Sequence, residues 1–379
     1  MPKERLPMKK PLKKINRRDF VKSQLAAGAA VSPVALIGCA GLQQAAGRPV
    51  PGRAREATAG AQAYAGPGSQ WSAEQMQGKS KMRMPKKITT AKPHIEGAGV
   101  HLHRGFGFGE TAPYDPFLLF DDFRNDDPRK YRNGFPWHPH RGIETITYVL
   151  AGNVEHQDSL GNKGTLGAGD IQWMTSGSGI LHQEMPLGDE RGRIHGFQLW
   201  ANLPAKLKMT KPRYQDVNSK DIPTVKDDDG TSVRILCGDF WGKTGPVQGI
   251  AAKPRYLDIS LPANTTRSIS IETTRHAFAY IIAGSVRFRD GSDPKDIRVE
   301  DPMNHGQQLR QFAGNRSLVL FDQGDSIRVE SGEQGGRFLL VSGEPIKEPV
   351  AWRGPIVMNT QDELRNAFRE LNQGTFIKN

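Results

Sequence analysis

From residue 97 onward, short runs of apolar and β-branched residues alternate with turns that contain glycine. Two examples are the runs over residues 145–150 and 277–282, each followed by an Ala-Gly turn and a second, valine-containing strand. Regularly spaced short strands of this kind are typical of β-sandwiches and β-barrels. The similarity of the two passages also indicates one β-barrel unit that occurs twice. The hydrophobic pattern therefore predicts an all-β protein.

One helix is predicted, close to the C-terminus. Thr360 and Glu363 have the spacing of a capping box, which marks a helix start. Leu364 and Phe368 then lie on one helical face, and Gly374 can end the helix. We expect this short helix to serve packing.

The pattern at the N-terminus is that of an export signal over residues 1–38. A basic stretch with Arg17 and Arg18 precedes a weakly apolar segment of fourteen residues, 25–38, and then Cys39. That segment falls short of the roughly 20 residues that span a bilayer as a helix. The paired arginines resemble a twin-arginine signal, although such a pair also arises by chance in a lysine-rich leader. The residues that end at Cys39 resemble a bacterial lipobox.

We therefore predict acylation of Cys39 and a lipid-anchored protein on the periplasmic side, at the outer membrane. Residues 39–92 are rich in Ala, Gly, Gln and Pro with scattered Lys and Arg, which predicts a flexible basic linker. The second cysteine, Cys237, lies in an apolar run. Two such cysteines exclude a disulfide framework, and Cys237 is expected to be a small buried residue rather than a nucleophile.

The net charge of +12 over 379 residues would suggest a nucleic-acid partner if it were evenly spread. Residues 1–22 carry nine Lys and Arg against two acids, and residues 39–92 carry the same numbers, so each stretch contributes +7. The remainder, residues 93–379, has a balance of −2. A broad phosphate-binding face is therefore not indicated, and no nucleic-acid partner is expected.

Candidate chemistry is concentrated in two short motifs. Of the ten histidines, eight lie between residues 94 and 195. His138 and His140 are two residues apart, and His182 and Glu184 repeat that spacing some forty residues later. On a β-strand this spacing places both side chains of a pair on one face. A single His-x-His is weak evidence for a metal site, whereas two such pairs that follow turn glycines are much stronger.

Folded into one barrel, the two pairs would supply three imidazoles and one carboxylate to a single divalent transition metal. These ligands suit iron, manganese, cobalt, nickel, copper or zinc, and the lack of thiolate disfavours a purely structural zinc site. Four protein ligands leave up to two positions open on an octahedral ion. Open positions are what metal-ion catalysis requires.

The same motifs carry a family resemblance. Four stretches are similar to pirin motifs, and two more, at 342–345 and 354–360, extend the resemblance so that it covers about residues 95–376. The four stretches are residues 115–123, 138–145, 170–186 and 196–204. The resemblance implies a bicupin, two antiparallel jelly-roll β-barrels followed by the short helix. It also implies one iron, in the N-terminal barrel, held by His138, His140, His182 and Glu184.

The domains expected from this resemblance follow the motifs along the chain. After the export signal and the linker, we expect an N-terminal metal-binding cupin, a C-terminal cupin without metal and a tail that holds the helix. Their expected ranges are 93–225, 226–345 and 346–379. The C-terminal cupin contains only His276 and His305 and no His-x-His or His-x-Glu pair, so it is expected to be structural.

Other residues near the motifs are expected to have supporting roles. Cupins in general often place a metal-binding glutamate soon after His-x-His, but in pirins the ligand matches Glu184, so Glu144 is expected beside the ligands. Arg141 could orient a carboxylate or form a salt bridge. Trp137 and Trp173, with Phe135, could form walls for a flat aromatic substrate or belong to the core. His156 and His195 are expected to line the cleft or to be structural.

Pirins of known activity resemble quercetin 2,3-dioxygenases, which open a flavonol ring with O2 and release carbon monoxide. The resemblance implies an enzyme for quercetin-like flavonols or related aromatic enols, in which Glu184 accepts the proton of the substrate 3-hydroxyl. We expect the protein to be a monomer. The alternative is a non-catalytic metal-binding or redox-sensing lipoprotein. Some pirins are transcription co-regulators, but an exported protein would not meet such partners.

Overall fold

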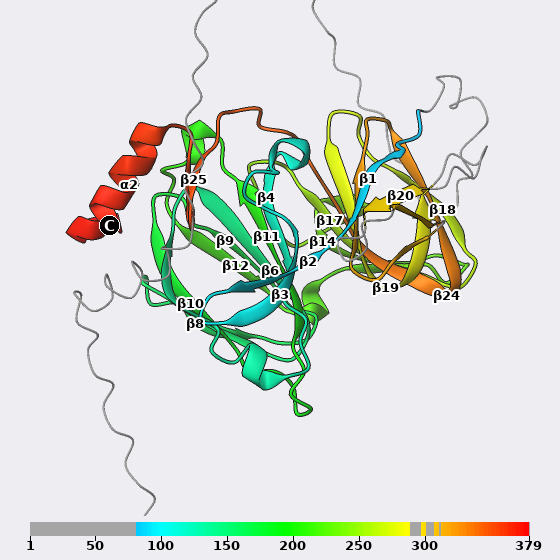
Figure 1. The fold of residues 1–379 in the computed structure, drawn as a ribbon, viewed down its shortest axis with the longest axis horizontal. Helices are drawn as coiled ribbons and strands as arrows, with labels where there is room; N and C mark the ends of the chain where they lie inside the picture. The colour runs from blue at the N-terminus through cyan, green and yellow to red at the C-terminus, as the bar shows by residue number, and fades with distance from the viewer. Residues whose placement is uncertain (1–80, 289–296, 301–306, 311, 379) are drawn as a thin grey trace, which may run out of the picture. The chain divides into compact units, whose positions relative to one another are not determined.

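The computed structural model describes residues 81–288, 297–300, 307–310 and 312–378, and these form two β-barrels and a C-terminal helix (Figure 1). This confirms the predicted all-β bicupin fold. The predicted signal residues Arg17 and Arg18 and the predicted acylation site Cys39 lie outside the described residues. No helix in the described part of the chain is long and apolar enough to cross a membrane.

Within the described residues, the first barrel consists of a seven-stranded and a four-stranded sheet. The larger sheet runs, in spatial order, through β12 (Arg213–Val217), β9 (Ile171–Thr175), β6 (Ile143–Ala151), β11 (His195–Asn202), β4 (Phe117–Asp122), β3 (Val100–Phe106) and β2 (Lys92–Glu96). The smaller sheet runs through β5 (Phe135–His140), β10 (Ile180–Pro186), β7 (Val154–Asp158) and β8 (Lys163–Leu166). The two motifs with candidate metal ligands thus lie on neighbouring strands of the smaller sheet.

The second barrel is built on one sheet, eleven-stranded as far as the chain is described. Its main path is β13 (Thr224–Lys226), β14 (Ser232–Cys237), β17 (Arg255–Leu261), β24 (Ser326–Gly343), β19 (His276–Phe288), β23 (Ser317–Phe321), β1 (Pro85–Thr90), β20 (Ile297–Glu300) and β21 (Gln307–Arg310). Off this path, β18 (Thr266–Ser270) pairs with β24 and β22 (Ala313–Gly314) pairs with β19. A two-stranded ribbon, β15 (Asp239–Phe240) and β16 (Lys243–Thr244), follows β14.

Strand β1 shows that the predicted linker ends earlier than residue 92. It lies within residues 39–92, yet it pairs antiparallel with β23 and parallel with β20 in the sheet of the second barrel. Ile88 is buried in that barrel's core, and the buried Arg83 donates to the carbonyls of Asp322 and Glu272. Residues 81–92 are therefore part of the folded protein. The sequence hid this because β1 is short and its partner strands are more than 200 residues away.

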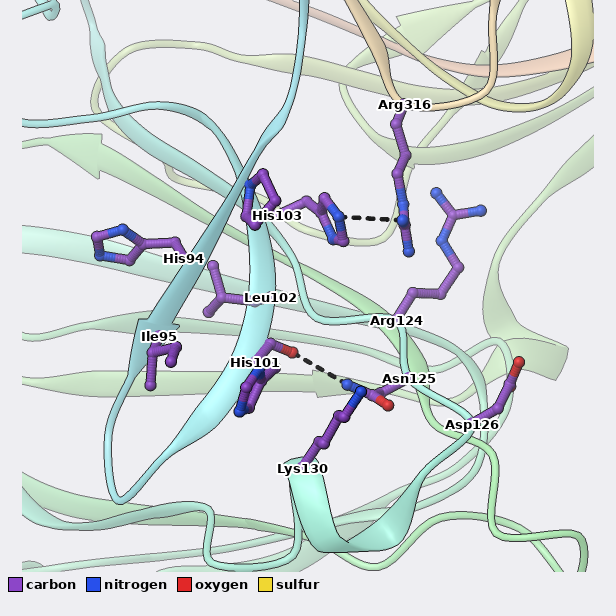
Figure 2. Close-up of a pocket in the computed structure, with 11 residues that line it drawn as sticks. His94, Ile95, His101, Leu102, His103, Arg124, Asn125, Asp126, Lys130 and Arg316 are labelled. Atoms are coloured by element: carbon purple, nitrogen blue, oxygen red, sulfur yellow. Dashed lines mark hydrogen bonds between the residues drawn. The ribbon is translucent and has the colours of Figure 1, made fainter. Parts of the chain in front are cut away.

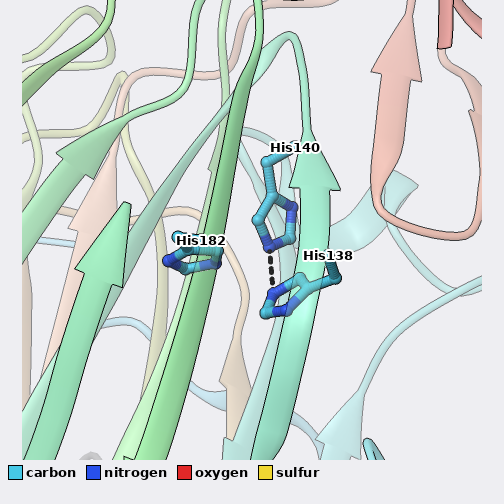
Figure 3. Close-up of side chains that lie close together, drawn as sticks. All are labelled: His138, His140 and His182. Carbon is cyan, nitrogen blue, oxygen red and sulfur yellow. Dashed lines mark hydrogen bonds between the residues drawn. The ribbon is translucent and has the colours of Figure 1, made fainter. Parts of the chain in front are cut away.

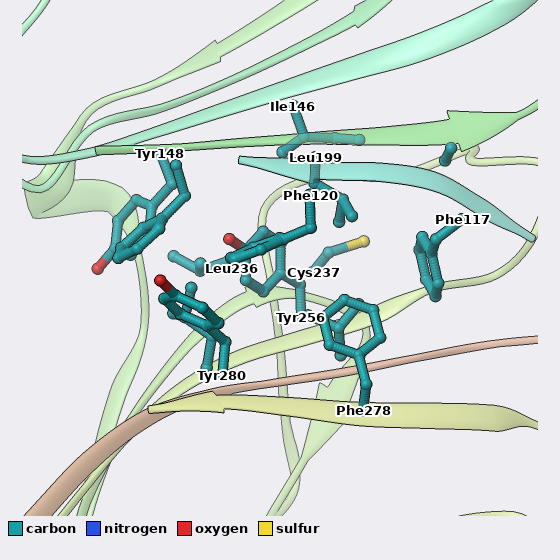
Figure 4. Close-up of a cluster of buried hydrophobic side chains, with 14 of the residues drawn as sticks. Phe117, Phe120, Ile146, Tyr148, Leu199, Leu236, Cys237, Tyr256, Phe278 and Tyr280 are labelled. Atoms are coloured by element: carbon teal, nitrogen blue, oxygen red, sulfur yellow. The ribbon is translucent and has the colours of Figure 1, made fainter. Parts of the chain in front are cut away.

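The two barrels share an apolar core (Figure 4). Tyr148 of β6 donates to Asp258 in the second barrel (2.7 Å), and Tyr280 of β19 donates to Asp122 in the first (2.8 Å). Each barrel therefore presents one tyrosine to a buried aspartate of the other. Cys237 lies in this core, where burial raises the pKa of its thiol to about 12. This confirms the expectation of a small buried residue.

The interiors of the two barrels differ in character. The second barrel is filled by a cluster of buried apolar side chains that includes Ile281, Phe288 and Phe338. The inner face of the first barrel instead carries buried histidine, glutamate and threonine side chains. Filling with apolar side chains is what a purely structural small barrel requires.

The tail after the second barrel returns to the first barrel. It forms the ribbon of β25 (Ala351–Arg353) and β26 (Ile356–Met358) and then helix α2 (Gln361–Gln373), which lies beside the first barrel in Figure 1. The predicted capping box of Thr360 and Glu363 is present, and Gly374 ends the helix at φ 72°. The apolar face of α2 packs on this ribbon, which confirms its packing role.

Lys208 ties the tail to the first barrel. It is 2% exposed, and its Nζ donates to the carbonyls of Gly142 (2.8 Å) and Val357 (3.0 Å) and to Oδ1 of Asn202 (2.5 Å). A buried ammonium is tolerated where such acceptors surround it. These three bonds join the turn between β5 and β6 and the end of β11 to β26.

Lys208→Met keeps the apolar stem but removes the three hydrogen bonds that Nζ donates, and only the Gly142 carbonyl keeps a second donor, the N–H of Leu203. We expect the free energy of unfolding to fall by about 2–4 kcal/mol, measured by urea unfolding followed by tryptophan fluorescence. Lys206→Met, at an exposed lysine two residues away, is the matched control and should change it by less than about 0.5 kcal/mol. Equal midpoints for the two variants would show that the three bonds do not stabilise the protein.

Candidate metal centre

Three imidazoles converge between β5 and β10 (Figure 3). In the antiparallel pairing of these strands, His138 lies directly opposite His182, and His140 lies opposite Ile180. The ring centroid of His182 is 4.3 Å from that of His138 and 5.0 Å from that of His140. The ligand atoms of the three histidines all lie within 4.8 Å of one another. One metal ion can therefore reach all three rings.

A β-bulge in β5 positions this set. Glu184 pairs with Phe135 whereas His182 pairs with His138, so two residues of β5, Pro136 and Trp137, oppose one residue of β10. Bulges of this kind bend a strand and redirect its side chains. Because Pro136 has no N–H to donate, it fits a place where regular pairing is interrupted.

Backbone carbonyls fix the direction of two rings. Nδ1 of His138 donates to the carbonyl of Pro136 (2.8 Å), and Nδ1 of His140 donates to the carbonyl of Pro355 (3.1 Å). A carbonyl only accepts, so in each neutral ring the proton is on Nδ1 and Nε2 keeps its lone pair. Both Nε2 atoms face each other at 3.1 Å. Two lone pairs at this distance repel, and a cation between them would relieve the repulsion.

Burial keeps the three rings neutral, which is the form that binds metal. It lowers the pKa of His138 to about 4 and, together with the neighbouring rings, lowers the pKa values of His140 and His182 well below 6.5. Both ring nitrogens of His182 are buried without a hydrogen-bond partner among the described residues. Unpaired buried nitrogens are costly unless a ligand uses them. The residues present therefore fit a metal ion.

Glu184, the predicted fourth ligand, lies next to this set but has partners of its own. It faces the same side of β10 as His182 and is 8% exposed. Its Oε1 is 3.1 Å from the hydroxyl of Thr147 on β6. Among the described residues, the group whose ligand atoms lie within 4.8 Å contains the three histidines and not Glu184. Coordination by Glu184 thus stays a prediction.

A short polar chain runs from Glu184 into the larger sheet. The Thr147 hydroxyl also lies 2.7 Å from Oε1 of Gln198, its partner across β6 and β11. A hydroxyl has one proton, so Thr147 donates either to Glu184 or to Gln198. Burial raises the pKa of Glu184 to about 7, and the Thr147 bond opposes that rise. The chain can accommodate Glu184 in either protonation state.

Arg141, assigned either to orient a carboxylate or to form a salt bridge, anchors the C-terminal tail. Its guanidinium donates to the carbonyls of Ser178 and Phe376 and to a carboxylate oxygen of Glu370, each at 2.7 Å. The guanidinium also lies over the Phe376 ring, 4.1 Å from its centroid. Of the two predicted roles, the salt bridge is the one observed. Arg141 immediately follows His140 and thereby links the tail to the metal centre.

Glu144 and Trp173 lie on the other side of the larger sheet. Glu144 accepts from Thr175 (2.8 Å), and burial raises its pKa to about 7. Along β6, alternation places Glu144 on the same face as Ile146 and Tyr148, which pack between the barrels. Trp173 is fully buried in that same core. The structure therefore does not bring these two residues to the histidines.

The remaining predicted residues lie in different parts of the first barrel. Trp137 and Phe135 are partly buried on β5. His156, buried on β7, lies opposite Glu184 in the register and stacks on Tyr214. His195 contacts Phe197, on the side of the sheet that packs between the barrels. Of the two, His156 is the one on a strand that pairs with β10.

Two neighbours of the centre were missed. The ring of Trp200 makes an edge contact with His140 (5.1 Å) and a tilted contact with Trp352 of the tail (5.9 Å). Pro355, whose carbonyl orients His140, also belongs to the tail. Alternation along β11 could have placed Trp200 on the metal-facing side. Nothing in the local sequence indicates that the tail returns to this barrel.

The fold and the site together define a class of protein. An antiparallel barrel with His-x-His on one strand and His-x-Glu on its neighbour, joined to a second, apolar barrel, is a bicupin, and its described residues contain one candidate metal centre. Among the described residues, the candidate metal-binding cluster lies in the first barrel.

Comparison with known proteins indicates which family of bicupins the chain resembles. The Pirin family model matches residues 99–201, and the Pirin C-terminal cupin domain matches residues 256–377. A pirin-like protein of Caulobacter vibrioides is 41% identical over 291 residues, covering 76% of this chain and 98% of that protein. Human pirin is 36% identical over 301 residues, covering 77% and 96%.

One solved structure has a similar fold. The quercetin 2,3-dioxygenase from Acinetobacter baumannii is 27% identical, with a TM-score of 0.67, and the match covers 78% of this chain and 99% of that one. The chain belongs to the pirin family. Its three-histidine cluster is suited to a divalent metal.

Proposed function

We propose that this pirin-family protein is a metal-dependent dioxygenase that opens the ring of quercetin-like flavonols, or of related aromatic enols, with O2. The observation that carries the proposal is the buried carboxyl of Glu184 on the same strand face as one of three converging neutral imidazoles. The similarity to the quercetin 2,3-dioxygenase of A. baumannii supports the reaction class.

Glu184 is the proposed base. It accepts the proton of the substrate 3-hydroxyl, and its pKa of about 7 is close to the pH at which a general base works best. The Thr147 hydroxyl lies 3.1 Å from the carboxyl and can donate to it when Glu184 is ionised. Trp200, in contact with His140, and the partly buried Trp137 offer flat apolar surface to an aromatic substrate.

His138, His140 and His182 would hold the metal, with Glu184 as the proposed fourth ligand. Iron is the metal we propose, and the same ligands also suit manganese, cobalt, nickel, copper and zinc. When bound, the ion supplies Lewis-acid and redox chemistry for a phenolate and O2. The carbonyls of Pro136 and Pro355 keep the first two imidazoles aimed at it.

Addition of quercetin to the iron-loaded protein tests the proposal. We expect consumption of O2 together with release of carbon monoxide, and we expect chelator-treated protein to show neither. Absence of turnover with several flavonols and several metals would contradict the proposal. That result would favour the alternative, a non-catalytic metal-binding or redox-sensing protein.

For the same chain we propose export and lipid anchoring, supported by the sequence motifs at Arg17, Arg18 and Cys39. Cys39→Ser is expected to move the protein from the membrane fraction to the soluble periplasmic fraction. Replacing both arginines with lysine should instead hold it in the cytoplasm. Fractionation with immunoblotting measures both results, and an unchanged distribution of the cysteine variant would contradict anchoring at this residue.

A further inference from the structure

A hollow lies where the first barrel meets the second, and none of the four predicted metal ligands lines it (Figure 2). Its volume is about 730 Å³. The β2–β3 hairpin and the segment after β4 form its walls, and Arg316 enters from the second barrel. Arg124 and Lys130 also line it, against a single acid, Asp126. The hollow is therefore positively charged although residues 93–379 are close to neutral overall.

Hydrogen bonds at its inner end leave donors without acceptors. Nη1 of Arg316 donates to Nε2 of His103 (3.1 Å), so the proton of His103 is on Nδ1. That Nδ1 and the Nε of Arg316 are both buried without a hydrogen-bond partner among the described residues. A buried unpaired donor costs about 1–3 kcal/mol. The inner end of the hollow therefore lacks an acceptor.

Asp122 does not supply the missing hydrogen-bond acceptor. It is fully buried, and it already accepts from Arg124 and from the hydroxyl of Tyr280. Its Oδ2 is 3.8 Å from Nε of Arg316, which is beyond hydrogen-bond distance. One carboxylate thus faces two guanidiniums. Burial and then the charge of Arg316 lower the pKa of His103, as expected for a ring in positive surroundings.

The backbone of Arg316 is strained. Its φ is 66°, a left-handed conformation that costs most non-glycine residues roughly 1–2 kcal/mol and that asparagine adopts more easily. Two backbone hydrogen bonds stabilise this conformation: the Arg316 N–H donates to the Ile281 carbonyl, and the Arg316 carbonyl accepts from the Ala91 N–H. An arginine thus occupies a position where the backbone conformation favours another residue. Its side chain ends in the hollow.

We propose that this hollow binds a small organic anion, a carboxylate or a phosphate monoester. The charged group lies between Arg316, Arg124 and Lys130 and supplies the missing acceptor. Its apolar part lies along the β2–β3 hairpin, where the exposed Ile95 lines the hollow. The volume lies within the range of roughly 300–1,000 Å³ that is typical of organic ligands, and an inorganic ion would fill little of it.

Titration calorimetry and thermal unfolding of the full-length protein test this, with benzoate, phenyl phosphate and uncharged benzyl alcohol as probes. We expect saturable binding of at least one anion and none of the alcohol. Arg316→Asn should weaken anion binding at least about tenfold because a charged hydrogen bond is lost. Its free energy of unfolding should stay equal or rise, because asparagine suits the local φ. Arg328→Asn, at an exposed arginine outside the hollow, should bind as before.

Three results would overturn the proposal. The first is that neither anion binds saturably. The second is binding that survives in Arg316→Asn and disappears in His182→Ala, which would place the anion at the metal centre. The third is an Arg316→Asn protein that is less stable but binds normally, which would make Arg316 structural. The preference between benzoate and phenyl phosphate decides which anion the site takes.

Discussion

His182→Ala is expected to reduce the metal content from about one ion per chain to less than about 0.1, a loss of affinity of at least about 100-fold. His182 lies opposite His138 and contributes one of three converging imidazoles. Both its nitrogens lack other partners among the described residues, so no alternative bond holds the ring in place. Elemental analysis of purified protein measures the metal. Thermal unfolding with and without chelator should then give the same midpoint for the variant.

A matched control is His195→Ala, which removes an imidazole from the same barrel without touching the cluster. Its metal content should equal that of the unmodified protein. The metal-free His182→Leu variant separates binding from stability. It loses two unpaired buried nitrogens, so its free energy of unfolding should be equal or higher by about 1–3 kcal/mol. Metal content unaffected by His182→Ala would contradict the assigned centre.

Glu184→Gln is expected to lower kcat for quercetin at least about 100-fold, because general-base catalysis typically contributes 10²–10⁴. An amide keeps the shape of the side chain and its contact with Thr147, but it cannot accept the proton of the substrate. Metal binding should weaken only modestly. Oxygen consumption, carbon monoxide release and metal content, measured on the same preparation, distinguish the two effects.

Glu155→Gln provides the same chemical change at an exposed position on the neighbouring strand β7 and should leave all three measurements unaltered. Unchanged oxygenase activity in Glu184→Gln would rule out Glu184 as the base. A complete loss of metal from that variant would instead show that Glu184 acts chiefly as a ligand.

Much of the centre could be predicted because it depends on strand periodicity. A period of two places His138 with His140, and His182 with Glu184, on a common face whatever the partner strand is. The capping box of α2 and the burial of Cys237 are equally local. Periodicity does not show, however, which part of the protein packs against each face of a strand. Glu144 is only four residues beyond His140 along the chain, yet its face of β6 meets the second barrel.

The sequence by itself determined the all-β class, the two pairs of metal-binding side chains and the terminal helix, because these follow from neighbours along the chain. Only the tertiary structure decided that His138 faces His182, that β1 completes the second barrel, and that Arg141 and Lys208 hold the returning tail. Each of these contacts joins residues far apart in the chain. They depend on strand register and on the packing of one barrel against another, which no local pattern encodes.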